Sequence, residues 1–133
     1  MSIETQNIPN LEVKSIEVGR FYFIHDQSLV GHPGLIIWKN DENNLYLAIK
    51  FGSSPNVHNI KFTRPVGDRV KTTYVYKRPF LGKRRDFSKK ELTDMIITTE
   101  EFSIVKGLVN LTNPVFSQSI NRKSKRAFKR LYK

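Results

Sequence analysis

The sequence predicts a mainly β domain of the α+β type: a small antiparallel barrel of five or six strands with one or two C-terminal helices. Its 133 residues are enough for one domain with a modest core and too few for two ordinary domains. The apolar segments are short and rich in β-branched and aromatic residues, which suit a pleated, half-buried surface. They follow one another closely, and short connections favour antiparallel pairing. Closure into a barrel would leave few exposed strand edges.

Composition excludes several classes of protein. Hydrophobic residues make up 38% of the chain and charged residues 26%, which fits neither a membrane-embedded nor a disordered protein. No apolar run approaches the roughly 20 residues that a membrane-spanning helix needs. The polar N-terminus is unlike a secretory signal. Cysteine is absent, which excludes disulfides and thiolate metal sites. We therefore expect a soluble, cytoplasmic protein that does not associate with membranes.

Positive charge is concentrated in two segments. The net charge is +11; residues 61–90 hold eleven Lys and Arg against two acids, and residues 121–133 hold seven against none. The first segment thus carries +9, the second +7, and the rest of the chain −5. This distribution indicates a surface for a polyanion, with nucleic acid as the expected partner. The alternative is a solvated surface that only keeps the protein soluble.

The first strand is predicted at Arg20–His25, whose nearly continuous apolar residues are typical of a central or covered strand. A β-hairpin follows, with strands at residues 35–38 and 45–49. Its turn, residues 40–44, consists of Asn, Asp and Glu. The Asn and Asp residues tolerate left-handed backbone conformations and bond their own main chain.

The later strands are predicted from weaker patterns. Residues 59–63 alternate between polar and apolar, which predicts a half-exposed strand. The proline-containing segment 64–68 is expected to end it. Residues 72–76 are a further strand, residues 77–85 a basic loop, and residues 94–98 a candidate for the last strand.

Two segments, Ser88–Glu91 and Thr98–Glu101, have the spacing of a capping box at a helix start. The second is followed by Phe102, Val105 and Val109, the pattern of an amphipathic helix.

The chain is expected to divide into a flexible arm over residues 1–15, the barrel with its helix over residues 16–112, and a basic tail over residues 113–133. The end of the tail is compatible with a helix. Three roles stay open for it: an RNA-binding arm, a surface for an acidic partner, and a disordered solubility tag.

The two open ends of the hairpin define a candidate site. His32 lies beside Pro33 and Gly34 at its entry, and Ser53, Ser54 and His58 follow its exit. Because an antiparallel hairpin brings its open ends together, these groups are expected to share one surface patch.

The run from Gly19 to Ile24, the segment Pro33–Ile37, the hairpin, the serine-containing loop and the strand after it resemble the PemK/MazF family of toxin endoribonucleases. The resemblance spans roughly residues 18–111. It implies an SH3-like barrel with a C-terminal helix, a homodimer, neutralisation by an antitoxin, and cleavage of single-stranded RNA without a metal or other cofactor. The Ser53–Pro55 loop also resembles the ToxN-like toxins, so the antitoxin is expected to be a protein or an RNA.

The chain departs from the family pattern at one position. Where the family typically has Arg-Pro at the entry to the first hairpin strand, this sequence has His32 and Pro33. The family's Thr or Ser at the end of the second strand is matched by Ser53 and Ser54. Some members carry a histidine where His58 stands.

Metal-free RNA cleavage uses the 2′-hydroxyl as nucleophile and needs a base, an acid and positive donors for the phosphorane. Imidazole serves as base or acid near neutral pH. We expect His32 and His58 to divide those roles, with Lys50 or Arg64 stabilising charge and Ser53 or Ser54 holding a phosphate oxygen. The alternative for each histidine is an ordinary surface or capping residue.

The basic loop interleaves aromatic and cationic residues, a pattern that suits single-stranded nucleic acid. The candidate nucleic-acid contacts are Arg64, Lys77, Arg78, Lys83, Arg84 and Arg85. The alternative for the aromatic residues is a place in the core. The alternative function is a non-catalytic nucleic-acid-binding module of a mobile element on the same barrel, because one fold hosts many functions.

Overall fold

The structure, a computed structural model, describes residues 15–25 and 31–131. The strands are β1 (Phe21–Ile24), β2 (His32–Asn40), β3 (Leu45–Gly52), β4 (Asn59–Val66), β5 (Arg69–Tyr76), β6 (Phe80–Gly82), β7 (Phe87–Glu91) and β8 (Val115–Phe116). The helices are the 3-10 helix η1 (Arg84–Asp86), α2 (Thr99–Leu108) and α3 (Arg122–Leu131). A mainly β fold with C-terminal helices is therefore confirmed. The described strands number eight, two or three more than predicted.

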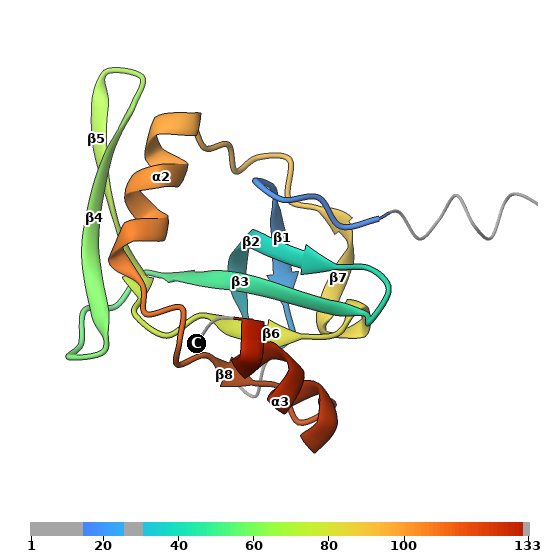
Figure 1. The fold of residues 1–133 in the computed structure, drawn as a ribbon. Helices are drawn as coiled ribbons and strands as arrows, with labels where there is room; N and C mark the ends of the chain where they lie inside the picture. The colour runs from blue at the N-terminus through green and yellow to red at the C-terminus, as the bar shows by residue number, and fades with distance from the viewer. Residues whose placement is uncertain (1–14, 26–30, 132–133) are drawn as a thin grey trace, which may run out of the picture.

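Strand β3 is the hub of the sheet. It pairs antiparallel with β2, β5 and β6, and the main path through the sheet runs β4-β5-β3-β2-β1-β7. The segment from β6 through η1 to β7 is bent: its start pairs with β3 and its end pairs with β1. This segment therefore links both sides of the β1–β2–β3 unit and makes the sheet strongly curved. Figure 1 shows the β4–β5 hairpin beside α2 at one side of the molecule, where β5 joins the other strands through the end of β3.

The β2–β3 hairpin forms as predicted. Asn44 has a φ of 55°, in the left-handed region that Asn tolerates at turns. The pairing register shifts between Ile36 and Trp38, so β2 contains a bulge there. Beside the turn, the Tyr46 hydroxyl donates a hydrogen bond of 2.9 Å to Asp41. Burial, and then this bond, raises the pKa of Tyr46 to about 12, while the same bond lowers the pKa of Asp41.

Both faces of β1 are buried, as predicted. The hairpin strands β2 and β3, whose residues predict a half-buried surface, are also buried on both faces over residues 34–37 and 45–49. One core cluster, which includes Leu35, Leu47, Ile49, Val105 and Phe128, lies toward the helices. The second, smaller cluster lies on the opposite face of the same strands; its members are Ile16, Tyr22, Ile24, Ile36, Tyr46, Ala48, Phe80 and Phe87. The polar residues that continue this second face form the site described below.

Four predictions of local structure are wrong. The predicted basic loop at residues 77–85 contains β6 and the first two residues of η1. The predicted break at residues 64–68 begins too early, because β4 runs through Pro65; an edge strand tolerates a proline there. Ser88–Glu91 is not a helix start but part of β7, where the Ser88 hydroxyl accepts a hydrogen bond from the Phe23 backbone N–H at 2.9 Å. Residues 94–98 form no strand. The second capping box is confirmed: Thr98 and Glu101 bond each other's backbone N–H at 3.0 Å.

The segment expected as a basic tail is part of the packed domain. Its β8 pairs in parallel with β6, and Ile120 and Phe128 are buried in the first core cluster. Phe128 packs edge-on against Trp38 and Phe116, with ring centroids 5.6 and 6.2 Å apart. A disordered solubility tag is thereby excluded for residues 115–131. The expected arm at residues 1–15 lies outside the described residues except for Ser15.

Across the two described ranges, none of the helices has the length and apolar character needed to cross a membrane.

Candidate functional site

A pocket of about 650 Å³ opens where the second core cluster ends. Two histidines, a lysine and an arginine line it together with the Phe80 ring. The other wall comes from the segment 115–119, which connects β8 to α3. The pocket thus combines residues from the end of β1, from β2, β3, β6 and η1, and from the C-terminal segment. The charged or polar lining residues are His25, His32, Lys50, Arg85, Asp86, Ser117, Gln118 and Ser119.

Strand register explains why His32 and Lys50 meet. Ile24 pairs with His32, and Gly34 pairs with Lys50. Because side chains alternate between faces, His32, Gly34 and Lys50 share the face that carries the second core cluster. Gly34 has no side chain there, and a Cβ at this position would lie 2.4 Å from the Ile24 Cδ1. The apolar face therefore ends at Gly34 and gives way to polar groups.

Tyr76 of β5 completes this part of the site. Its hydroxyl lies 3.0 Å from Nε2 of His32, and the two rings meet edge-on at a centroid distance of 5.2 Å. A Cβ on Gly52 would lie 3.1 Å from the Tyr76 ring, so the glycine makes room for it. The Lys50 ammonium lies 5.1 Å from the centre of the Tyr76 ring and 5.8 Å from that of Phe80. These contacts hold His32 and Lys50 close to one another.

Asp86 organises the opposite wall. Its Oδ2 accepts hydrogen bonds from the Lys83 backbone N–H at 2.6 Å and from the hydroxyls of Ser117 and Ser119 at 2.9 Å each. The two hydroxyl oxygens are 2.7 Å apart. The Asp86 carbonyl accepts the backbone N–H of His25 at 2.8 Å. One residue therefore ties η1, the end of β1 and the C-terminal segment together around the pocket.

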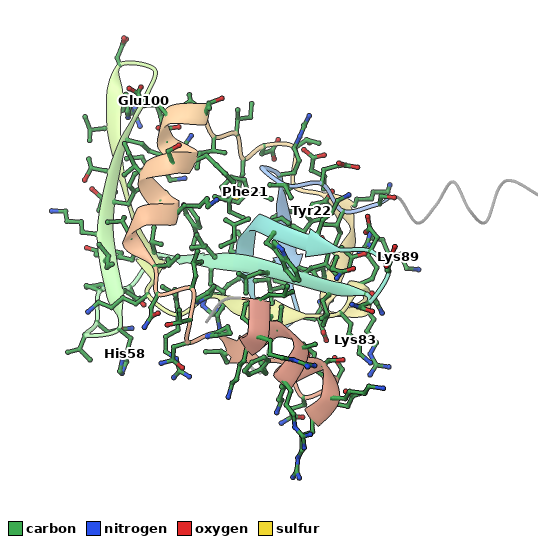
Figure 2. The ribbon with its side chains drawn as sticks, viewed as in Figure 1. Phe21, Tyr22, His58, Lys83, Lys89 and Glu100 are labelled. Carbon is green, nitrogen blue, oxygen red and sulfur yellow. The ribbon has the colours of Figure 1, made fainter. Side chains whose placement is uncertain are left out.

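Only part of the predicted catalytic set lines this pocket. His32 and Lys50 do; Ser53, Ser54 and His58 do not. These three lie in an exposed loop beyond the last pair of β3 with β5, Gly52 with Tyr74. In that loop the Asn56 side chain accepts the His58 backbone N–H at 2.8 Å, an Asx turn. Figure 2 shows His58 near one end of the β4–β5 hairpin, far across the molecule from Lys83.

The predicted nucleic-acid contacts also divide. Arg64 pairs with Glu101 of α2 at 3.1 Å and donates to the Ile96 carbonyl, with only 17% of its side chain exposed, so it braces β4 against α2. Arg84 donates to the carbonyls of Ser88 and Lys89 at 3.0 Å each. Two of the predicted cations thus serve mainly the fold.

The other cations lie at the surface in two places. Lys77 and Arg78 are exposed beside the loop of His58, and each donates a hydrogen bond of 3.3 Å to a backbone carbonyl. Arg85 lines the pocket, and Lys83, half-buried, lies between β6 and η1.

Several residues in the pocket or beside it were not predicted as site residues. His25 was interpreted mainly as the end of an apolar strand, which it is, yet it also lines the pocket. Tyr76, which contacts His32 beside the pocket, is predicted only as the end of the strand at residues 72–76. Asp86, Ser117 and Ser119 carry no local signal, because they meet only through the docking of the C-terminal segment. One signal in the sequence could have placed His25 in the site: it directly follows the first strand, whose last residue, Ile24, pairs with His32.

In comparisons with known proteins, no family model, no curated protein and no solved structure matches this chain.

Proposed function

We propose that this protein is a metal-independent endoribonuclease that cleaves single-stranded RNA. The observation that carries the proposal is the pocket in which His25, His32, Lys50 and Arg85 surround one space. Its volume of about 650 Å³ lies in the range of sites for small organic ligands, and a nucleotide is of that class. The set supplies both proton-transfer groups and positive charge, which together are what the reaction needs.

In the proposed reaction, the RNA 2′-hydroxyl attacks the adjacent phosphorus while one imidazole removes its proton. The bond to the 5′-oxygen breaks, and the second imidazole gives that oxygen a proton. The products are a 2′,3′-cyclic phosphate and a 5′-hydroxyl. His25 and His32 take the two proton-transfer roles, and Lys50 and Arg85 stabilise the charge on the phosphorane. Compared with the set predicted from sequence, His25 replaces His58 and Arg85 replaces Arg64.

Single-stranded RNA is the substrate class that the lining favours. Phe80 and Phe116 present apolar surface in the same pocket as the cations. Unpaired bases pack on aromatic and apolar groups while cations contact the backbone, whereas bases within a duplex are already stacked.

We further propose that the enzyme is the toxin of a toxin–antitoxin system, neutralised by a protein or RNA antitoxin and acting as a homodimer. This part rests on the resemblance to the PemK/MazF and ToxN-like toxins. Expression in a bacterial host tests it: we expect growth arrest together with transcripts that end in 5′-hydroxyl groups. Growth arrest with intact transcripts would contradict it.

The biochemical test uses purified protein, a labelled single-stranded RNA and a chelator. We expect cleavage that persists in the chelator and stops when the nucleotide 5′ to the cut carries a 2′-deoxy substitution. Cleavage of the substituted strand would contradict the 2′-hydroxyl mechanism.

A second candidate function is nucleic-acid binding without cleavage. It is favoured by the absence of Ser53, Ser54 and His58 from the pocket, since three of the five residues predicted to be catalytic lie elsewhere. Binding that weakens steeply with salt, without any cut strand, would support this function instead.

A further inference from the structure

A second pocket adjoins the first. Its volume is about 490 Å³, and its lining contains four cations and no carboxylate; the polar residues that line it are His25, Asn44, Lys83, Arg84, Arg85 and Lys89. His25 and Arg85 line both pockets, so the two spaces meet at these residues. The side chains come from the end of β1, the turn of the β2–β3 hairpin, the β6–η1 connection, η1 and β7.

The fold places these cations together through Arg84. Its backbone N–H donates to the Asn44 side chain at 2.9 Å, which ties η1 to the hairpin turn. Its guanidinium donates to the carbonyls of Ser88 and Lys89 and lies 5.9 Å from the centre of the Tyr22 ring. The Arg84 side chain therefore has a structural role: it holds the start of β7 beside η1.

The other three cations that line this pocket are not held by carboxylates of the described residues. Lys83, Arg85 and Lys89 form no ion pair with any residue in the described ranges. Lys89 and Arg85 are exposed, and Lys83 is half-buried. Figure 2 shows Lys83 and Lys89 on the same side of the molecule, near the hairpin turn. Three cations around one concave space, without a neutralising carboxylate, repel one another unless an anion binds between them.

We propose that this second pocket is a phosphate subsite that holds the phosphodiester next to the one being cleaved. The inference rests on the proposed function, because it takes the first pocket as the place of the scissile phosphate. It adds that the substrate is a strand with at least two phosphates, which passes over His25 and Arg85. Lys83 and Lys89 contact only the neighbouring phosphate, whereas Arg85 contacts both.

Binding of short 2′-deoxy oligonucleotides tests the subsite without cleavage, because they lack the nucleophile. We compare a thymidine dinucleotide, which has one phosphodiester, with the trinucleotide, which has two. For the wild type we expect about tenfold tighter binding of the trinucleotide, and a steeper dependence on salt. The double variant Lys83→Ala/Lys89→Ala is expected to lose this gain and to bind the dinucleotide like the wild type.

The matched control is Lys61→Ala/Lys71→Ala, which removes two exposed lysines from the β4–β5 hairpin. It lowers the net charge by the same amount and is expected to keep the trinucleotide gain. An unchanged gain in the Lys83/Lys89 variant, or an equal loss in the control, would overturn the subsite.

The outcomes also separate the two proposals. If the tighter binding of the trinucleotide depends on Lys83 and Lys89 but the protein cuts no RNA, the phosphate subsite is supported and the proposed catalysis is contradicted. If the protein cleaves RNA, but its tighter binding of the trinucleotide does not depend on Lys83 and Lys89, the subsite alone is contradicted.

Discussion

The hydroxyl of Tyr76 lies 3.0 Å from Nε2 of His32 although β3 separates their strands in the sheet. The contact crosses β3 at Gly52, which leaves room for the tyrosine ring, and Lys50 lies over the same ring. Tyr76, from the basic segment 61–90, thereby holds His32 in one orientation at the entry to the hairpin.

Tyr76→Phe tests this contact. The variant removes the hydrogen bond to His32 and keeps the ring beneath Lys50. A hydrogen bond of this kind contributes about 0.5–1.5 kcal/mol, so we expect single-turnover RNA cleavage to slow by about threefold to tenfold. Because Tyr76 acts through His32, the pH profile of cleavage should shift as well. An unchanged rate and profile would show that the contact has no role in positioning His32.

Phe128→Ala tests whether α3 belongs to the folded domain. The substitution empties a buried site against Trp38 and Phe116, and we expect a loss of about 3–5 kcal/mol in the free energy of unfolding measured with urea. The control is Leu131→Ala, on the same helix but 63% exposed, which should change stability by less than about 0.5 kcal/mol. Equal, small effects of both variants would contradict the docking of α3.

Arg64→Ala separates a structural cation from an RNA contact. Arg64 joins β4 to α2 through Glu101 and the Ile96 carbonyl, so we expect a loss of about 1–3 kcal/mol in stability and little change in the salt dependence of RNA binding. Exposed Arg69, also in the β4–β5 hairpin, provides the matched control. If Arg64→Ala, but not the Arg69 variant, markedly lowers the salt dependence of RNA binding, then Arg64 contacts a phosphate after all.

Alkaline pH should destabilise the protein through Tyr46. Its pKa is about 12 in the folded protein against an ordinary value of 10.0, so the folded state holds the phenolic proton more tightly. The stability due to this proton is fully present below the ordinary value and is lost as the pH rises through the folded pKa. In urea unfolding from about pH 9 to about pH 11.5, Tyr46→Phe should show a shallower decline than the wild type. Identical declines would contradict the raised pKa.

The parts of the fold that local patterns encode were predictable. The hairpin turn at residues 40–44 and the Thr98–Glu101 capping box each contain their own stabilising side chains. Ser88–Glu91 has the same spacing as that capping box, but pairing of β7 with β1 overrides it. Pairing between segments this distant is invisible to a local pattern. The docking of residues 115–131 depends on a few apolar residues, chiefly Ile120 and Phe128, in an otherwise cationic stretch.

The sequence could predict the candidate site only for the residues whose positions follow from strand pairing. An antiparallel hairpin brings its open ends together, and His32 and Lys50 do lie in one pocket. The same rule failed for His58, because the chain leaves the sheet after Gly52 and the intervening loop turns outward. Asp86, Ser117 and Ser119 meet across more than thirty residues of sequence through hydrogen bonds that no spacing reveals.

Single-turnover cleavage of RNA by three histidine variants tests the central claim most directly. If His25 and His32 transfer the protons, His25→Ala and His32→Ala should each lower the rate by about 100-fold or more, while His58→Ala cleaves like the wild type. A severe loss with His58→Ala, or full activity in both His25→Ala and His32→Ala, would contradict the assignment of the active site to this pocket.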